Sequence, residues 1–189
     1  MGLMDISELK TELEKLHSSS YGWALSCCRR DPSEAEEVLQ TVYLKILEGK
    51  ARSSGESSLK TWLFAVIHKT AASEHRKSLL RWLRFTVEPD QGEPVSPTAG
   101  PATAFETTEA QMCFQRALAE LPARQRETLH LVFYQDLSLR EAADVMDISI
   151  GSARTHYERG KKRLRETLGQ TEVGYGVDWR GKENPSAVS

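Results

Sequence analysis

Apolar side chains recur along this chain at intervals of three and four residues, which is the period of an amphipathic α-helix. The clearest series runs over residues 35–47, and a second series over 59–71 predicts a helix that ends near Lys77. Leucines between residues 9 and 25 predict one or two earlier helices. No window in these segments alternates with the period of a β-strand, so the pattern indicates an all-α fold.

The helix predicted over residues 35–47 has its own start and stop signals. Asp31 is placed as an N-cap acid, Pro32 occupies the first helical position, and Glu34 lies at the third. Each of these residue types stabilises the first turn of a helix. Gly49 follows the last apolar residue and provides a stop.

The second half of the chain predicts four more helices. Two short apolar stripes lie on either side of Pro122. Ser138 and Glu141 have the spacing of a capping box and begin a third helix. Ser149 is placed to cap a long final helix over residues 150–168.

A segment of different composition separates the two halves. Residues 86–110 contain five acidic residues, no basic residue, and four of the seven prolines. Such a segment can neither continue a helix nor bury a core, so it predicts a flexible acidic linker. We therefore expect two small helical domains, with the chain divided into an N-terminal helical segment (1–20), a first domain (21–85), the linker, a second domain (111–168) and a tail (169–189).

Charge is unevenly distributed, although the whole chain has a net charge of only −2. Residues 1–85 contain 13 basic against 11 acidic residues, and residues 111–168 contain 10 against 8. Both helical blocks are thus mildly basic, and the segment between them is acidic.

The residues around Asp147 have the spacing of a helix-turn-helix. That motif needs a small residue where the helices touch, a turn residue that tolerates the left-handed conformation, and a small residue early in the second helix. Ala143, Asp147 and Ala153 meet these needs in order. The last helix then carries six basic residues between Arg154 and Arg165, which favours DNA binding over an ordinary solvated face.

Residue types that would indicate an enzyme are scattered. The five histidines form no cluster, there is no glycine-rich phosphate loop, and the three cysteines lack the spacing of a zinc site. We expect no catalytic residue, no metal and no cofactor. His68 and His75 share a helix face and are expected to be exposed. Cys27 and Cys28 are interpreted as idle thiols, with a redox switch as the alternative.

No apolar run approaches the length of a membrane span, and the first residues lack an apolar leader segment. The sequence therefore predicts a cytoplasmic protein without membrane insertion.

Together these motifs resemble the extracytoplasmic function (ECF) type of the sigma-70 family. The segments DPSEAEEVLQTVY, from Asp31, and GESSLKTWLF, from Gly55, resemble region 2 of that family. The segments LPARQRE, from Leu121, LSLREAA, from Leu137, and SIGSARTH, from Ser149, look like region 4. The resemblance implies an alternative sigma factor that directs RNA polymerase core to promoter DNA, with an anti-sigma factor as a possible further partner.

The resemblance also implies three sets of binding residues. The polymerase clamp helices are expected to contact Glu36, Glu37, Gln40, Thr41 and Lys45. The −10 element is expected to contact Gly55, Ser57, Ser58, Lys60, Trp62, Lys69, Arg76 and Lys77. The −35 element is expected to contact Ser152, Arg154, Thr155, His156, Glu158, Arg159 and Lys162. The polymerase flap is expected as a further contact.

The chemistry of these residues suits the implied roles. Arginine can donate two hydrogen bonds to guanine and glutamate can accept one from cytosine, so Arg154 and Glu158 are competent readers of base edges. Trp62 could stack on a single-stranded base, but its position in an apolar stripe also favours the core. Tyr157 has the same two interpretations. Lys69 departs from the family, which usually has asparagine there.

One rival interpretation belongs to a different class of protein. A helix-turn-helix regulator that acts alone would also have a basic last helix, with an N-terminal domain for sensing or dimerisation. The acidic face over residues 34–37 and the position of Trp62 argue against it. An adaptor that binds only proteins would leave the basic helix unexplained.

Overall fold

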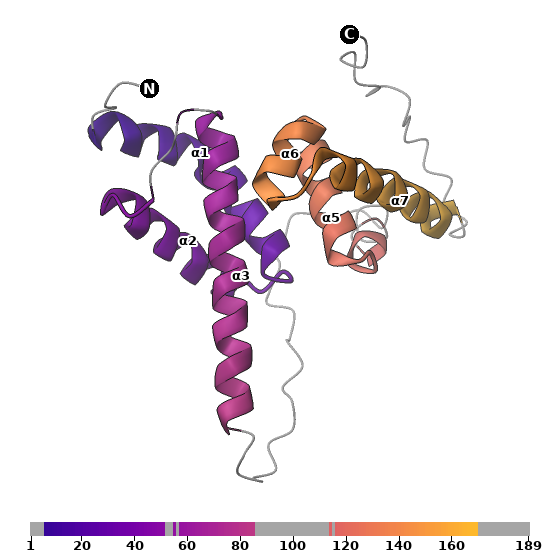
Figure 1. Ribbon diagram of the computed structural model, residues 1–189, viewed down its shortest axis with the longest axis horizontal. Helices are drawn as coiled ribbons and strands as arrows, with labels where there is room; N and C mark the ends of the chain where they lie inside the picture. The colour runs from indigo at the N-terminus through magenta and orange to yellow at the C-terminus, as the bar shows by residue number, and fades with distance from the viewer. Residues whose placement is uncertain (1–5, 52–54, 56, 86–113, 115, 170–189) are drawn as a thin grey trace, which may run out of the picture.

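The structure is a computed structural model that describes residues 6–51, 55, 57–85, 114 and 116–169. Every element in these ranges is helical, which confirms the all-α fold (Figure 1). The elements are α1 (Ile6–Cys27), α2 (Pro32–Leu47), α3 (Leu59–Phe85), α5 (Ala123–Leu129), η1 (His130–Tyr134), α6 (Leu139–Met146) and α7 (Ile150–Gly169). The predicted linker over residues 86–110 and almost all of the predicted tail lie outside the described residues.

Helix α2 begins and ends where its sequence signals lie. The Asp31 side chain accepts a hydrogen bond from the Glu34 amide at 3.1 Å, and Pro32 occupies the first turn. At the other end Gly49 has a φ of 71°, and its amide donates to the Ile46 carbonyl at 3.0 Å. The left-handed conformation of Gly49 is what a glycine adopts without steric cost.

The end of α6 and the start of α7 confirm the predicted turn. Ser138 and Glu141 form a capping box, with the Glu141 carboxylate accepting from the Ser138 amide at 2.9 Å. Asp147 ends α6 in the left-handed conformation, at φ 55° and ψ 49°. The Ser149 hydroxyl accepts from the Ser152 amide at 3.1 Å and so caps α7.

Helix α1 agrees with the one or two helices predicted for its segment, whereas α3 extends beyond its predicted end. Residues 6–27 form one continuous helix, α1, and α3 continues past Lys77 to Phe85. No glycine or proline lies between residues 59 and 85, so nothing in the local sequence stops α3 where its core stripe ends. Its last turns project from the bundle (Figure 1) and leave four large apolar side chains 49–61% exposed: Leu79, Leu80, Trp82 and Leu83. No described helix has a segment long and apolar enough to span a bilayer.

The two predicted helical blocks lie together on one buried core. Trp23 of α1 and Phe64 of α3 are fully buried, and the Trp23 indole donates to the Phe64 carbonyl at 3.0 Å. The same cluster includes Leu131 of η1 and Met146 of α6 from the second block. Helix α6 packs on α3, and α1 packs on α2, α3 and η1. Both predicted helical domains are therefore present, and in this arrangement the second block completes the core of the first.

A second, smaller cluster holds α7 on the second block. Leu129 of α5 packs with Tyr157 and Leu164 of α7, all of them less than 10% exposed. Gly160 permits this close approach, because a Cβ atom there would lie 3.1 Å from a Leu129 methyl group. Helix α7 is therefore fixed by one face and leaves the opposite face to solvent.

Candidate nucleic-acid interface

The start of α7 is positioned by the helix-turn-helix that the sequence predicted. Ala143 and Ala153 are buried where α6 and α7 touch, at 2% and 0% exposure. The Ile148 amide donates to the Ala143 carbonyl at 3.1 Å, which closes the turn around Asp147. These small residues let the two helices approach closely, so the outer face of α7 has a defined orientation.

Most of the residues predicted to contact the −35 element form one exposed face of α7. Ser152, Arg154, Thr155, Glu158, Arg159 and Lys162 are exposed, and His156 is half-buried. Among the described residues, neither Arg154 nor Arg159 has an ion-pair partner within 4.0 Å. Two unpaired guanidinium groups on an exposed helix face are available to base edges or phosphates. Tyr157 lies on the core side, 8% exposed and stacked on Phe133.

The other polar groups of this face are already engaged within the protein. The Thr155 hydroxyl donates to the Gly151 carbonyl at 2.9 Å, and the Ser152 hydroxyl lies 2.9 Å from that of Ser149. Lys161 lies over the Tyr157 ring at 4.8 Å. Glu158 lies 3.8 Å from the Lys161 ammonium, so direct readout by α7 would depend most on the two arginines.

The residues predicted to contact the −10 element do not form one surface. One side of α3 carries three of them, spaced seven residues apart: Trp62, Lys69 and Arg76. Lys60 lies on a different side, with its ammonium 5.5 Å from the centre of the Phe64 ring. Lys77 is exposed on the projecting part of α3, beside Glu74 at 2.8 Å.

The loop before α3 has a structural role as well. Ser58 caps α3, because its hydroxyl accepts from the Thr61 amide at 3.1 Å. Gly55 has a φ of 81°, a conformation that few other residues adopt. Ser57 is half-buried. Trp62 is also half-buried: one side of its ring packs against the core, and the other side is accessible to a ligand.

Two of the predicted −10 residues contact the second block. The Lys60 ammonium donates to the Gln135 carbonyl at 2.7 Å. Lys69 pairs with Asp147, in the turn before α7, at 3.4 Å. Close by, the Thr61 hydroxyl donates to the Glu141 carboxylate at 3.3 Å. Nucleic acid could therefore reach Lys60 and Lys69 only in competition with the second block.

Helix α2 presents the residues predicted to contact the polymerase. Glu36, Glu37 and Gln40 are exposed, and Thr41 is half-buried. Lys45 turns inward, where its ammonium donates to the Thr70 hydroxyl at 3.2 Å.

Sequence reasoning missed the apolar part of this α2 face. Leu44 and Leu47 are 59% and 44% exposed, on the same side as Glu37 and Gln40. Leu47 is the last residue of the apolar series over residues 35–47, and its spacing alone does not show that it is exposed. Large apolar side chains exposed among polar ones are typical of an interaction surface. The sequence did contain a signal for this surface. The apolar residues of α2 cover a wider arc of the helix than one buried face needs, so some of them must be exposed.

His68 contradicts the expected exposure of the histidine pair. Its side chain is 12% exposed, stacks on Trp23 at 6.1 Å, and lies 3.6 Å from the Glu127 carboxylate of α5. The expectation was wrong because α5 covers this part of α3, and a single helix pattern cannot reveal a contact made by a distant segment. His75 is exposed, as expected.

The cysteine pair supports the idle-thiol interpretation. Burial, with Glu127 nearby, raises the pKa of the Cys27 thiol well above its usual range. Burial, together with Glu34 and Asp31, raises the pKa of Cys28 to about 12. The reactive thiolate form is therefore disfavoured at both positions. In the parts of the chain that the structure describes, no three residues of the metal-binding types gather into a possible site.

Comparisons with known proteins agree with the arrangement of helices. Residues 13–81 match the family model "Sigma-70 region 2", and residues 111–164 match "Sigma-70, region 4". The chain is 24% identical to the RNA polymerase sigma factor YlaC of Bacillus subtilis over 135 residues, covering 71% of this chain and 77% of that protein. It is 27% identical to the ECF RNA polymerase sigma factor SigX of the same organism over 141 residues, covering 74% and 73%.

Similar folds occur among solved structures. The sigma factor RpoE of Bartonella quintana, in complex with the anti-sigma factor NepR, matches with a TM-score of 0.66 at 23% identity, over 87% of this chain and 98% of that one. The protein CnrH, in complex with the cytosolic domain of CnrY, matches with a TM-score of 0.58 at 15% identity, over 87% and 90%.

Proposed function

This chain belongs to the sigma-70 family of RNA polymerase sigma factors, as a member of the ECF type, and from this premise we propose how its surfaces divide the work of promoter recognition. The chain acts as an alternative sigma factor that directs core polymerase to specific promoters and starts transcription. Such a role places it in the cytoplasm with the chromosome. In transcription initiation the chain binds polymerase and DNA, and it catalyses no chemical step itself.

The observation that carries the proposal is the exposed face of α7. Arg154 and Arg159 are exposed and have no ion pair with any residue that the structure describes, and the other side of their helix is fixed by α5 and α6. A helix held in this way can enter the major groove with its first two turns against base edges. We assign recognition of the −35 element to this face, and we propose that Lys162 contacts the phosphate backbone of the DNA.

Helix α2 is the proposed contact with core polymerase. Its exposed face combines Glu36, Glu37 and Gln40 with the apolar side chains of Leu44 and Leu47. An apolar centre with a charged rim is the usual composition of a protein interface. Lys45 is a weaker candidate than its neighbours, because its ammonium already binds Thr70.

Promoter binding requires the two blocks to separate. The positions −10 and −35 lie about 25 base pairs apart, which is roughly 85 Å at 3.4 Å per base pair. In the structure, Lys69 on the −10 side of α3 lies 3.4 Å from Asp147, directly before α7. The chain between Phe85 and Phe114 can span up to roughly 90 Å when extended, so the blocks can reach both elements once they part. We propose that the described arrangement is a closed state of the sigma factor.

The stand-alone regulator is the weaker alternative. It would leave the match to region 2 over residues 13–81 without a role. An anti-sigma factor is a proposed partner, since RpoE, which has a similar fold, was solved bound to NepR.

A transcription assay tests the function directly. Purified chain is added to bacterial core polymerase with duplex DNA that carries candidate promoters. We expect RNA from one defined start site, and none from core polymerase alone. Specific binding of the chain to promoter DNA, combined with no effect on core polymerase, would favour the stand-alone regulator.

The polymerase contact has its own test. Glu37→Lys combined with Gln40→Ala is expected to abolish co-purification with core polymerase while helical content stays unchanged. The matched control is Glu8→Lys, a charge reversal at an exposed position of α1. Normal binding by the folded double variant would move the interface away from α2.

A further inference from the structure

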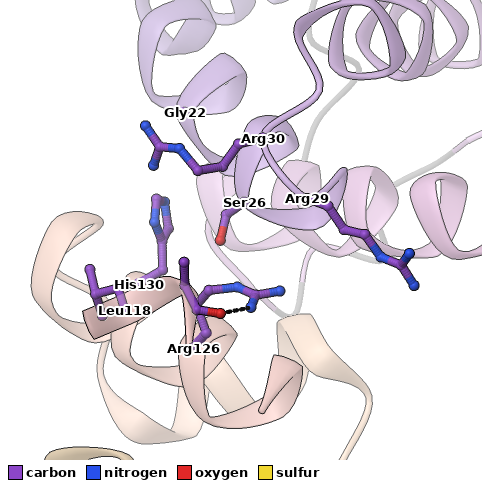
Figure 2. Close-up of a pocket in the computed structure, with 8 residues that line it drawn as sticks. Gly22, Ser26, Arg29, Arg30, Leu118, Arg126 and His130 are labelled. Atoms are coloured by element: carbon purple, nitrogen blue, oxygen red, sulfur yellow. Dashed lines mark hydrogen bonds between the residues drawn. The ribbon is translucent and has the colours of Figure 1, made fainter. Parts of the chain in front are cut away.

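A cavity of about 310 Å³ lies between the end of α1 and the second block. Gly22, Ser26, Arg29 and Arg30 line it from the first block, and Leu118, Ala119, Arg126 and His130 line it from the second. Its volume is within the range of small-molecule sites. Figure 2 shows the Arg30 side chain extending over the His130 ring, Ser26 directed toward the space between the blocks, and Arg126 below it.

The lining of this cavity is cationic and contains no carboxylate. Three of its eight residues are arginines. The Arg126 guanidinium donates to the carbonyls of Leu121 at 3.2 Å and Ala119 at 3.5 Å, and that of Arg29 turns outward to His75 at 3.3 Å. Arg30 has no ion pair within 4.0 Å among the described residues. Within the described part of the chain, no carboxylate lies among the lining residues to neutralise this positive charge.

The acids nearest in sequence are engaged elsewhere. Asp31 caps α2 by accepting from the Glu34 amide. Glu127 lies 3.6 Å from both His68 and Arg124. The field of Arg30 is felt within the cavity, because burial first and Arg30 second lower the pKa of His130 to about 4. The ring is thus a neutral hydrogen-bonding group at ordinary pH.

The backbone that carries the arginines is held in an unusual conformation. Arg29 and Arg30 have φ values of 53° and 67°, which are uncommon for residues other than glycine, asparagine and aspartate. The Arg30 amide donates to the Leu25 carbonyl at 2.8 Å, so the turn is fixed. Strained positions of this kind are concentrated at ligand-binding sites. Glycine would form the same turn without strain, but it would not place a guanidinium at the cavity.

We propose that this cavity binds a small phosphorylated anion that bridges the two blocks of the chain. Arg30 is the main ligand to the phosphate, because guanidinium groups bind phosphate oxygens through paired, charge-assisted hydrogen bonds. Ser26 and His130 offer additional polar groups, and Leu118 provides an apolar wall for the rest of the molecule. Both blocks contribute to the site, so the anion binds the closed state and shifts the chain toward it.

Calorimetric titration of the full chain with pyrophosphate tests the proposal, and ATP and citrate are titrated in parallel. We expect one pyrophosphate per chain. Arg30→Gln and Arg30→Gly should each weaken binding by about tenfold or more. The glycine variant relieves the strained φ, so its loss of binding cannot be attributed to misfolding. ATP binding in the same Arg30-dependent way would identify a nucleotide as the source of the phosphate, and pyrophosphate binding without ATP binding would identify a smaller anion.

The control is Arg159→Gln on α7, which removes an exposed arginine away from the cavity and should leave the affinity unchanged. Loss of binding in Arg159→Gln, with retention in both Arg30 variants, would place anion binding on the DNA-binding helix and overturn the proposal. Equal affinity for citrate and pyrophosphate would overturn the assignment to phosphate. No saturable binding at millimolar pyrophosphate would also refute the site. None of these measurements requires polymerase or promoter, so they stand apart from the test of the sigma-factor function.

Discussion

Arg154, Arg159 and Lys162 share the exposed face of α7, but their chemistry predicts different effects on DNA binding. Arg154→Ala or Arg159→Ala should cost about 1–3 kcal/mol on the preferred −35 sequence and relax the choice at one base pair. Lys162→Ala should weaken binding to all DNA sequences alike. It should also lower the slope of log affinity against log salt concentration by about one. Binding measured against salt concentration on preferred and altered duplexes separates the two. Equal losses of affinity on every sequence for all three variants would show that α7 binds DNA through charge alone and does not read its sequence.

His130 makes the folded state sensitive to acid. Its pKa is lowered to about 4, by burial and then by Arg30, whereas an unfolded histidine titrates near 6.5. Between these values the unfolded chain binds a proton that the folded chain excludes, so stability is lost as pH falls from about 7 toward 4. The free energy of unfolding should drop by about 2 kcal/mol between about pH 7 and pH 5 from this group.

Urea unfolding of the wild type and of His130→Phe at the two pH values isolates this contribution. Phenylalanine preserves the ring contacts with Trp23 and Tyr134, at 5.5 and 5.3 Å between centroids, and cannot titrate. The variant should lose less stability on acidification than the wild type. An identical loss in both proteins would assign the acid sensitivity to the carboxylates.

At the scale of single elements, two of the three glycines of α7, Gly151 and Gly160, predict opposite responses to alanine. A Cβ atom at Gly151 would lie 3.9 Å from the Ser149 hydroxyl, which is ordinary contact. Gly151→Ala should therefore stabilise the protein by up to about 1 kcal/mol. At Gly160 the Cβ would lie 3.1 Å from Leu129 and 3.3 Å from Gln125, and Gly160→Ala should gain nothing or lose about 1 kcal/mol. Urea unfolding of both variants measures the difference, and equal gains would mean that α5 and α7 are less tightly packed than described.

Local signals in the sequence predicted the ends of elements well wherever a backbone or capping group decided them. The N-cap at Asp31, the capping box at Ser138 and the left-handed Asp147 all follow from chemistry within a few residues. The end of α3 was predicted wrongly, because the end of a core stripe is not a stop signal. The buried position of His68 was also missed, since it depends on α5, which lies some sixty residues further along the chain.

At the scale of the whole molecule, the fold class and both family regions could be predicted from the sequence, but the contact between the regions could not. Leu131 and Met146 have the spacing of residues that pack within their own domain. Nothing in that spacing indicates that they complete the core around Trp23 and Phe64. The exposed α7 face was predictable, whereas the partial cover over Lys60 and Lys69 was not.

Locking the closed state should abolish transcription. Cysteines replace Lys69 and Asp147, whose side chains are 65% and 75% exposed, and Cys113 is replaced by serine. A short thiol-reactive cross-linker that contains a cleavable disulfide then joins them. Because α3 and α7 cannot reach both promoter elements while joined, promoter-directed RNA should fall at least about tenfold, while binding to core polymerase through α2 persists.

Reduction of the cross-linker should restore transcription, and the Lys69→Cys single variant treated in the same way is the control. Full activity of the joined chain would show that the blocks need not separate. The native Cys27 and Cys28 should not interfere, because their raised pKa values disfavour the reactive thiolate.

The core shared by the two blocks also has a consequence for how the protein is made. Trp23 and Phe64 leave the ribosome long before Leu131 and Met146, which cover the same cluster. At roughly 5–20 residues per second, translation from Ala71 to Met146 takes about 4–15 s. For that time the nascent N-terminal helices present an incomplete apolar surface. A chaperone or an inhibitory protein that is present during synthesis can therefore reach a face of the chain that the finished protein has closed.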